Sequence, residues 1–208
     1  MNIENIGVVI FDGVERLDIE GPLGVLGWSS RVSGNPLSIR MLSKHGRPVK
    51  DHLIDRQIEV DGATTTEAGF DLLLVPGGDL QQFGNDLELV SEIRRLGSAS
   101  QIVASVCTGA FLVAQTGLAD GKSMTTHWQT RTLFRQRFPS ITLSEHRFES
   151  DGNLWSSAGI SAGIDMSLRL VASLWGTTVA KTVQDFLEYF PEPPYAREQN
   201  PQNHPPTV

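Results

Sequence analysis

The stretch QIVASVCTGAFLVAQTG, residues 101–117, decides the fold. Its first part is a short apolar run rich in β-branched residues, which is typical of a strand buried on both faces. The part after the cysteine has the apolar spacing of a helix and ends at Gly117, because glycine commonly follows the last turn of a helix. A strand that leads directly into a helix predicts a unit of a parallel α/β sheet.

Cys107 lies at the join between the predicted strand and helix and is the only cysteine of the chain. Ser105 and Gly109 place small residues two positions before and after it, which is the steric pattern of a nucleophile elbow. The start of a helix also favours a thiolate, so we expect an exposed, activated thiol. The alternative is a buried, inert cysteine, which is the commoner case for a free cysteine.

The rest of the chain repeats the alternation of strands and helices. Apolar runs at 6–13, 37–46 and 71–78 predict further strands, and helical spacing follows several of them. We therefore expect one α/β domain over residues 1–195, a three-layer sandwich whose mainly parallel sheet has helices on both faces. Residues 196–208 are rich in proline, asparagine and glutamine and predict an extended or disordered tail.

Composition excludes several functional classes. A net charge of -7 without a cluster of lysine and arginine argues against nucleic-acid binding. The first residues lack the basic region of a signal peptide, and no apolar run is long enough to span a membrane. A single cysteine cannot form an internal disulfide. The spacing of histidine and acidic residues does not indicate a metal site, and the glycines do not match a dinucleotide-binding or phosphate-binding loop. We expect a cytoplasmic protein without a cofactor.

Two acidic residues follow the first predicted strand, in the segment ERLDIEGP. Ligands of open α/β sheets bind outside the carboxyl ends of the strands, where Cys107 also lies. Asp18 or Glu20 is therefore a candidate acid or base beside the thiol, with a pKa raised by burial. The alternative is an acid that only interacts with the helix dipole.

Further candidates come from glycines and a histidine. Gly77 and Gly78 follow another predicted strand, and their N–H groups would form an anion site together with the amide of Thr108. Taken alone, two glycines are as often simply a tight exit from a strand. His127 is a candidate base for Cys107, although a histidine at a strand end is more often structural.

Several motifs resemble the ThiJ/PfpI superfamily, which has the class I glutamine amidotransferase-like fold. They occur in the family's order and cover about residues 5 to 195: FDGVERLDIEGPLGVL, DLLLVPGG, ASVCTGAFLVAQTGLADGKSMTTHW and DGNLWSSAGISAGIDMSLRLV. The isonitrile hydratase branch of that superfamily is the most similar.

The resemblance implies a cofactor-independent enzyme, usually a homodimer, that adds water to an isocyanide and releases an N-substituted formamide. It implies Cys107 as the nucleophile, Asp18 as the general acid/base and Thr108 as the residue that holds water or the intermediate. It also places Gly78 in the anion-binding loop and a backbone contact at Ile160. One departure is the pair Ser157–Ala158, where the family has two glycines; we expect a narrower or stiffer wall near the nucleophile there.

Other members of the superfamily offer different functions. The sensor domains of AraC-type regulators share these motifs and precede a helix-turn-helix region, for which we expect no room before Val208. A ligand-binding module without catalysis, a redox-responsive protein with an oxidisable Cys107, a glyoxalase-like enzyme and an amidase stay open as alternatives.

Overall fold

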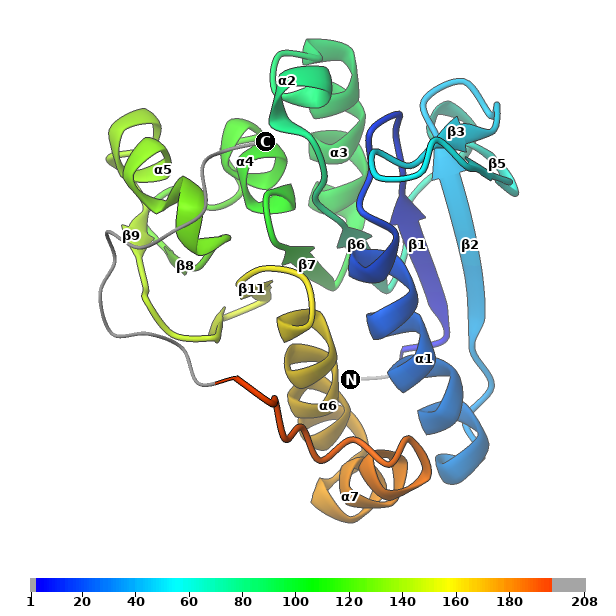
Figure 1. Ribbon diagram of the computed structural model, residues 1–208. Helices are drawn as coiled ribbons and strands as arrows, with labels where there is room; N and C mark the ends of the chain where they lie inside the picture. Colours follow the sequence, from blue (N-terminus) through cyan, green and yellow to red (C-terminus); the bar gives the residue numbers. More distant parts are fainter. Residues whose placement is uncertain (1–2, 196–208) are drawn as a thin grey trace.

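The fold is built around one sheet of seven strands, seen in a computed structural model that describes residues 3–195 (Figure 1). The strands run in the order β10-β11-β7-β6-β1-β2-β5. All neighbours are parallel except β10 and β11, which form an antiparallel hairpin at one edge. The strand bounds are β1 Asn5–Val9, β2 Ser38–Ser43, β5 Gly62–Ala63, β6 Leu72–Val75, β7 Ile102–Val106, β10 Phe148–Asp151 and β11 Leu154–Ser157.

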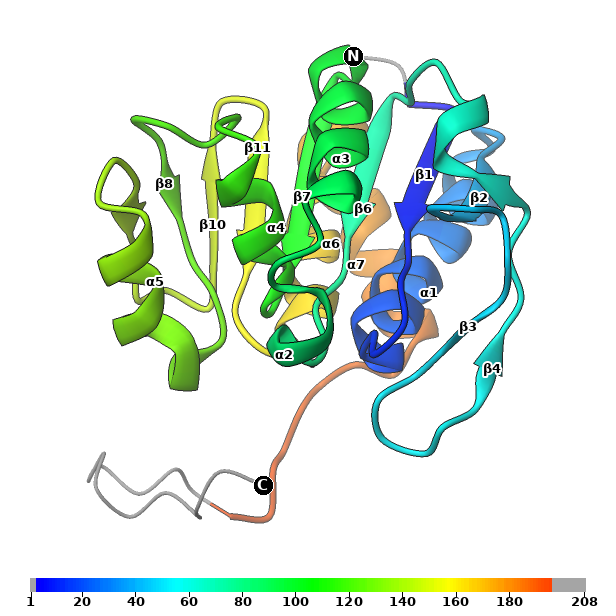
Figure 2. The ribbon, with the colours of Figure 1, turned by 90° about the horizontal axis from the view of Figure 1, so that it is seen from above.

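Helices cover both faces of this sheet, as the view from above shows (Figure 2). Helices α1, α6 and α7 pack against one another on one face, and α3 and α4 lie on the other. The mainly parallel three-layer arrangement predicted from the sequence is confirmed. The helix bounds are α1 Arg16–Ser33, α2 Leu80–Phe83, α3 Leu87–Ala99, α4 Gly109–Gln115, α5 Arg131–Arg137, α6 Ala162–Trp175 and α7 Thr177–Phe186.

The central strands are buried on both faces because helices cover both sides. Every residue of β6 and β7 is buried, which is why these segments read as continuous apolar runs and not as alternating ones. The sheet thereby fixes the position of the short loops that leave β1, β6, β7 and β11.

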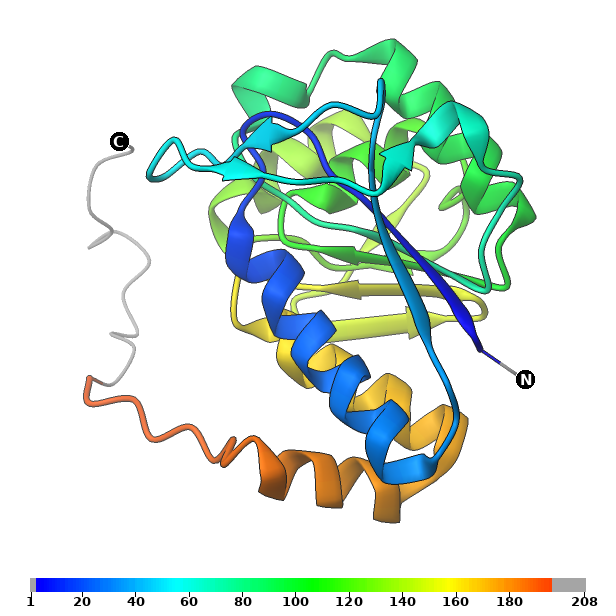
Figure 3. The same cartoon turned by 90° about the vertical axis from the view of Figure 1, so that its right-hand side faces the viewer.

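Two short pairs of strands lie outside the main sheet. A two-stranded hairpin made of β3 and β4 passes over the start of α1 (Figure 3). A second pair, β8 and β9, is parallel and lies near α5. The bounds are β3 Val49–Lys50, β4 Gln57–Ile58, β8 Ser123–Met124 and β9 Thr142–Leu143, with 3₁₀ turns at Thr64–Thr66 and Trp128–Thr130.

The element boundaries refine the sequence-based expectations. The first strand ends at Val9, so residues 10–13 belong to the loop that leads to the site. Strands β10 and β11 form a hairpin whose turn contains Asp151, Gly152 and Asn153. The expected tail 196–208 lies outside the described residues, and the single-domain division stays a prediction. Among the described residues, no helix is both long and apolar enough to cross a membrane.

Candidate functional site

The candidate site lies where four neighbouring parallel strands end. The strands β11, β7, β6 and β1 are adjacent and parallel, so their carboxyl ends lie at one edge of the sheet. The segments that follow them carry the residues predicted from the sequence. Ligands of open parallel sheets bind at this edge, so these four strand ends form the candidate binding site.

Cys107 occupies the sharp turn between β7 and α4. Its φ of 58° lies in the left-handed region, which a residue other than glycine rarely adopts. Two hydrogen bonds hold this conformation: the Cys107 N–H donates to the Ser157 carbonyl at 3.0 Å, and the Thr126 hydroxyl donates to the Cys107 carbonyl at 2.9 Å. A Cβ at Gly109 would collide with the carbonyl oxygens of Val75 and Pro76. The turn therefore has the strained geometry of an elbow and requires the small residue that follows it.

Two backbone N–H groups act on the thiol of Cys107. Hydrogen bonds from the amides of Ile160 and Thr108 favour the thiolate. Ile160 also has a positive φ, of 33°, so a second strained residue points its backbone toward the sulfur. Donors placed in this way stabilise a negative charge on the sulfur or on an atom bonded to it.

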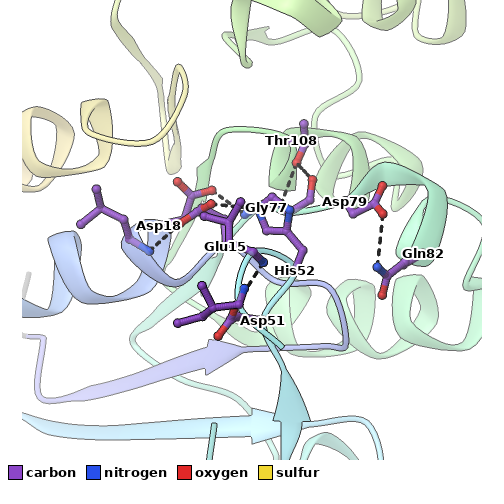
Figure 4. A network of polar contacts seen from close by, with 12 residues as sticks. Glu15, Asp18, Asp51, His52, Gly77, Asp79, Gln82 and Thr108 are labelled. Atoms are coloured by element: carbon purple, nitrogen blue, oxygen red, sulfur yellow. Dashed lines mark hydrogen bonds and ion pairs between the residues drawn. The ribbon is translucent and has the colours of Figure 1, made fainter. Parts of the chain in front are cut away.

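Asp18 is completely buried in the first turn of α1. Its Oδ2 accepts the N–H of Gly77 at 3.0 Å (Figure 4), whereas Oδ1 is buried without a well-formed hydrogen bond among the described residues. Burial raises the pKa of the Asp18 carboxyl well above its usual range, and the charge of Glu15 adds to that rise. The hydrogen bond from Gly77 and the interaction with Cys107 act in the opposite direction. Asp18 is thus a carboxyl group poised to carry a proton beside the sulfur.

The protonation of the Cys107 thiol differs from the thiolate expected from the sequence. Burial raises the pKa of Cys107, and the negative charge of Asp18 raises it further. These effects outweigh the hydrogen bonds from the amides of Ile160 and Thr108 and from the Thr108 hydroxyl, which act in the opposite direction. The prediction of an exposed, free thiolate was therefore wrong: Cys107 is 7% exposed and shares its proton chemistry with Asp18.

The loop after β6 is used differently from the prediction. The hydroxyl of Thr108 donates to the Gly78 carbonyl and accepts the Gly78 N–H, both at 2.9 Å. The N–H of Gly77 is taken by Asp18. The two glycine N–H groups therefore do not form a free anion site; they position the Asp18 and Thr108 side chains. A Cβ at Gly77 would lie 2.6 Å from the Thr108 nitrogen, so the close approach requires glycine.

Sequence reasoning missed an acid–imidazole pair beside Asp18. Glu15 is buried, and its Oε2 lies 2.8 Å from Nε2 of His52 (Figure 4). The other carboxylate oxygen caps α1 by accepting the N–H of Leu17 at 3.0 Å. Glu15 stands three residues before Asp18 in ERLD, which was a signal, but nothing in the sequence indicates that His52 lies beside it.

Of the two remaining predicted residues, His127 lies in the cleft beside Cys107 and Glu20 does not. His127 lines the cleft that gives access to the Cys107 thiol. In the described part of the chain, residues 3–195, no hydrogen bond connects the His127 and Cys107 side chains. Burial lowers the pKa of His127, and the charge of Arg131 lowers it further, so the imidazole is neutral near pH 7. Glu20 is exposed on α1 and lies outside the cleft.

Ser157 and Ala158, where the family has two glycines, are not part of the cleft lining. The expected narrower or stiffer wall near the nucleophile stays a prediction. Ser157 is fully buried at the end of β11 and contributes its carbonyl to Cys107.

A cleft of about 730 Å³ gives access to the thiol. Its lining includes Cys107, Thr108, Gly78, His127 and Ile160, so most of the predicted site residues share one space. In the described part of the chain, no group of three or more His, Cys, Asp or Glu side chains is arranged to hold a metal ion.

These features define an α/β protein with a cysteine at a strand–helix elbow and a buried carboxyl beside it. The chain belongs to the DJ-1/PfpI family, whose model matches residues 4–173.

Two kinds of curated protein are similar over most of the chain. An isonitrile hydratase from Pseudomonas putida is 34% identical over 193 residues, which cover 91% of this chain and 80% of the relative. An HTH-type transcriptional regulator, GbdR of Pseudomonas aeruginosa, is 27% identical over 98% of this chain. The chain spans 54% of that regulator's length.

Solved structures give the same family. A ThiJ/PfpI family protein from Pseudomonas syringae superposes with a TM-score of 0.84 at 28% identity, covering 94% of this chain and 78% of that chain. Drosophila melanogaster DJ-1β shares the fold, with a TM-score of 0.74 at 23% identity over 90% of this chain and 98% of the other.

Proposed function

We propose that the protein is a cofactor-independent hydratase that converts an isocyanide and water into an N-substituted formamide. The observation that carries the proposal is the buried carboxyl of Asp18, whose raised pKa keeps a proton beside the sulfur of Cys107. The terminal carbon of an isocyanide must receive both a nucleophile and a proton. A thiol and a carboxylic acid in contact supply both.

The reaction begins when the Cys107 sulfur attacks the terminal carbon and forms the S–C bond. The same carbon takes a proton from the Asp18–Cys107 pair, which gives a thioimidate. Near neutral pH the pair shares this one proton, because burial raises both pKa values and the charge of Asp18 raises that of the thiol further. Its transfer to carbon leaves Asp18 as a carboxylate. The amides of Ile160 and Thr108 favour the thiolate before the attack.

Water completes the reaction. Asp18, now a carboxylate, accepts a proton from water as the oxygen attacks the thioimidate carbon. Asp18 passes this proton to the nitrogen. The C–S bond then breaks, and the remaining hydroxyl proton is carried by Asp18 to the departing sulfur, which leaves as the thiol. One water molecule is consumed, the N-substituted formamide is released, and Cys107 and Asp18 return to their starting state. No cofactor enters this sequence.

Incubation with cyclohexyl isocyanide, followed by chromatographic quantification of N-cyclohexylformamide, tests the proposal. We expect turnover by the wild type and none by Cys107→Ala. Absence of turnover by a folded wild-type protein rejects the hydratase function.

A ligand-sensing function without catalysis is the second candidate. It is supported by the alignment with GbdR, which covers 98% of this chain. In that case the cleft binds a small molecule and the same assay shows no product. Loss of methylglyoxal in a parallel incubation would instead favour a glyoxalase-like reaction.

The expectations of a homodimer and of no nucleic-acid partner stay predictions. Size-exclusion chromatography with light scattering checks the first, and a DNA-binding assay checks the second.

A further inference from the structure

We propose that Glu15 is a specificity-determining residue of the cleft, which makes the site accept neutral or cationic electrophiles and reject anionic ones. This inference deepens the proposed function, because it names the charge class of the substrate. It rests on the groups that line the cleft and on the contacts that hold them there.

The cleft has an acidic lining. Two carboxylates, Glu15 and Asp79, line it together with the imidazoles of His52 and His127, and no lysine or arginine does so among the described residues. His127 is neutral near pH 7 because burial lowers its pKa. An anion that approaches Cys107 therefore meets two carboxylates and no lysine or arginine side chain in the wall of the cleft.

Two guanidinium groups adjoin the cleft, but neither is part of its lining. Arg16 pairs with Asp51 at 3.0 Å. Arg131 donates to the Glu145 carbonyl at 2.9 Å, and its charge acts on the His127 side of the cleft.

Glu15 is held in place from both sides. One oxygen caps α1 and the other contacts His52, which belongs to the loop between β3 and β4. The backbone of this loop is attached as well, because the His52 N–H donates to the Val14 carbonyl at 3.3 Å. A carboxylate fixed in this way cannot swing out of the path of a ligand, so its charge acts on every molecule that enters.

The same loop contributes an apolar contact. Leu53 follows His52, is 69% exposed and lines the cleft. A hydrocarbon substituent placed against Leu53 removes apolar surface from water, whereas a carboxylate in the same position faces Glu15. The substrate class that fits is an uncharged or positively charged electrophile on a hydrocarbon group.

The single cysteine allows a test that does not depend on isocyanide turnover. Three methanethiosulfonates transfer a trimethylammonioethylthio, a methylthio or a sulfonatoethylthio group to Cys107. Each reaction forms a mixed disulfide with the Cys107 sulfur, releases the thiol proton to solvent and releases methanesulfinate. Intact-mass spectrometry gives each rate, which is divided by the rate with 2-mercaptoethanol. We expect the wild type to react faster with the cationic reagent than with the anionic one after this correction.

Glu15→Gln is the informative variant. The glutamine oxygen still accepts the Leu17 N–H, so the start of α1 is kept while the charge is lost. We expect the anionic-to-cationic rate ratio to rise roughly tenfold, as loss of one charge a few ångströms from the path requires. Glu20→Gln is the matched control: it removes one carboxylate from the second turn of α1, at an exposed position outside the cleft. Its ratio should equal that of the wild type.

An isocyanide panel adds the link to function. We expect kcat/KM for isocyanoacetate, relative to that for cyclohexyl isocyanide, to rise in Glu15→Gln. If no isocyanide is turned over, the hydratase function fails while the thiosulfonate ratios still decide the role of Glu15. An unchanged ratio in Glu15→Gln, an equal shift in Glu20→Gln, or a folded protein whose Cys107 reacts with none of the three reagents overturns the inference.

Discussion

The carboxyl group of Asp18 raises the pKa of the Cys107 thiol, in addition to the larger rise caused by burial. The two residues come from different strand–helix units and meet because the ends of β1 and β7 lie at one edge of the sheet. The loop after β6, the strand between β1 and β7, joins the two units: its Gly77 N–H donates to Asp18, and its Gly78 N–H donates to the hydroxyl of Thr108. The protonation of the thiol is therefore set by the fold and not by the sequence around the cysteine.

Replacing Asp18 by asparagine tests this coupling. The variant keeps an oxygen that accepts the Gly77 N–H but carries no charge. We expect the pKa of the Cys107 thiol to fall relative to the wild type, because one of the two causes of its rise is gone. Formamide production should fall at least a hundredfold, because the proton donor and acceptor is lost. The pH dependence of iodoacetamide alkylation measures the thiol; an unchanged alkylation profile would contradict the coupling.

The same substitution predicts a pH-dependent gain in stability. The folded-state pKa of Asp18 lies above its ordinary value of 3.8, so the folded protein binds this proton more tightly than the unfolded chain does. Below pH 3.8 the carboxyl is protonated in both states and costs nothing. As the pH rises from there toward the folded-state pKa, wild-type stability falls. Urea unfolding of Asp18→Asn and wild type should diverge over this interval, with the variant more stable at pH 7; parallel curves would exclude the effect.

Thr108→Val removes the two hydrogen bonds that join its hydroxyl to Gly78. The side chain keeps its shape, but the Gly78 N–H and carbonyl lose their partner. We expect a loss of about 1–3 kcal/mol in the free energy of unfolding. Thr108→Ser keeps the hydroxyl and is the matched control, with a loss below about 1 kcal/mol. Denaturant unfolding distinguishes the two, and equal losses would show that the methyl group, not the hydroxyl, matters.

Cys107→Gly and Cys107→Ala separate backbone strain from chemistry. Neither variant has a nucleophile, but only glycine adopts a φ of 58° without strain. We expect the glycine variant to be more stable than the alanine variant by roughly 0.5–1 kcal/mol, the reverse of the usual order. Thermal unfolding of both proteins measures the difference. An alanine variant that is the more stable would mean that the turn relaxes when the thiol is removed.

Gly77→Ala tests the close packing behind the pair. The new Cβ would lie 3.0 Å from Asp18 Oδ2 in addition to its clash with the Thr108 nitrogen, so the loop must move. We expect a loss of more than about 2 kcal/mol in stability and a loss of formamide production. Gly24→Ala is the control, because a Cβ in that part of α1 meets nothing within 4 Å. It should gain about 0.5–1 kcal/mol from helix propensity.

The sequence predicts the fold well because the strong signals are local. The run before Cys107, the small residues on both sides of it and the helical spacing after it all lie within one short segment. The location of the site at the carboxyl ends of the strands was predictable for the same reason. Each strand end is marked in the sequence by a glycine or a polar residue, and parallel strands bring those ends to one edge of the sheet.

The site was less predictable because its contacts are not local. The N–H groups of Gly77 and Gly78 looked available, yet Asp18 and Thr108 use them. His52 carries no motif, and only the β3–β4 hairpin brings it to Glu15. The protonation of Cys107 was misjudged because the start of a helix is visible in a sequence, whereas the burial that opposes it is not.

Both main-chain groups of Cys107 are tied to other segments of the chain. Its N–H donates to the Ser157 carbonyl and its carbonyl accepts the Thr126 hydroxyl, so these two bonds do not depend on the thiol. The architecture around position 107 thus tolerates a change of side chain there without being rebuilt. A reactive atom at this point can therefore be gained or lost by one substitution while the two main-chain bonds that tie the turn to its neighbours remain.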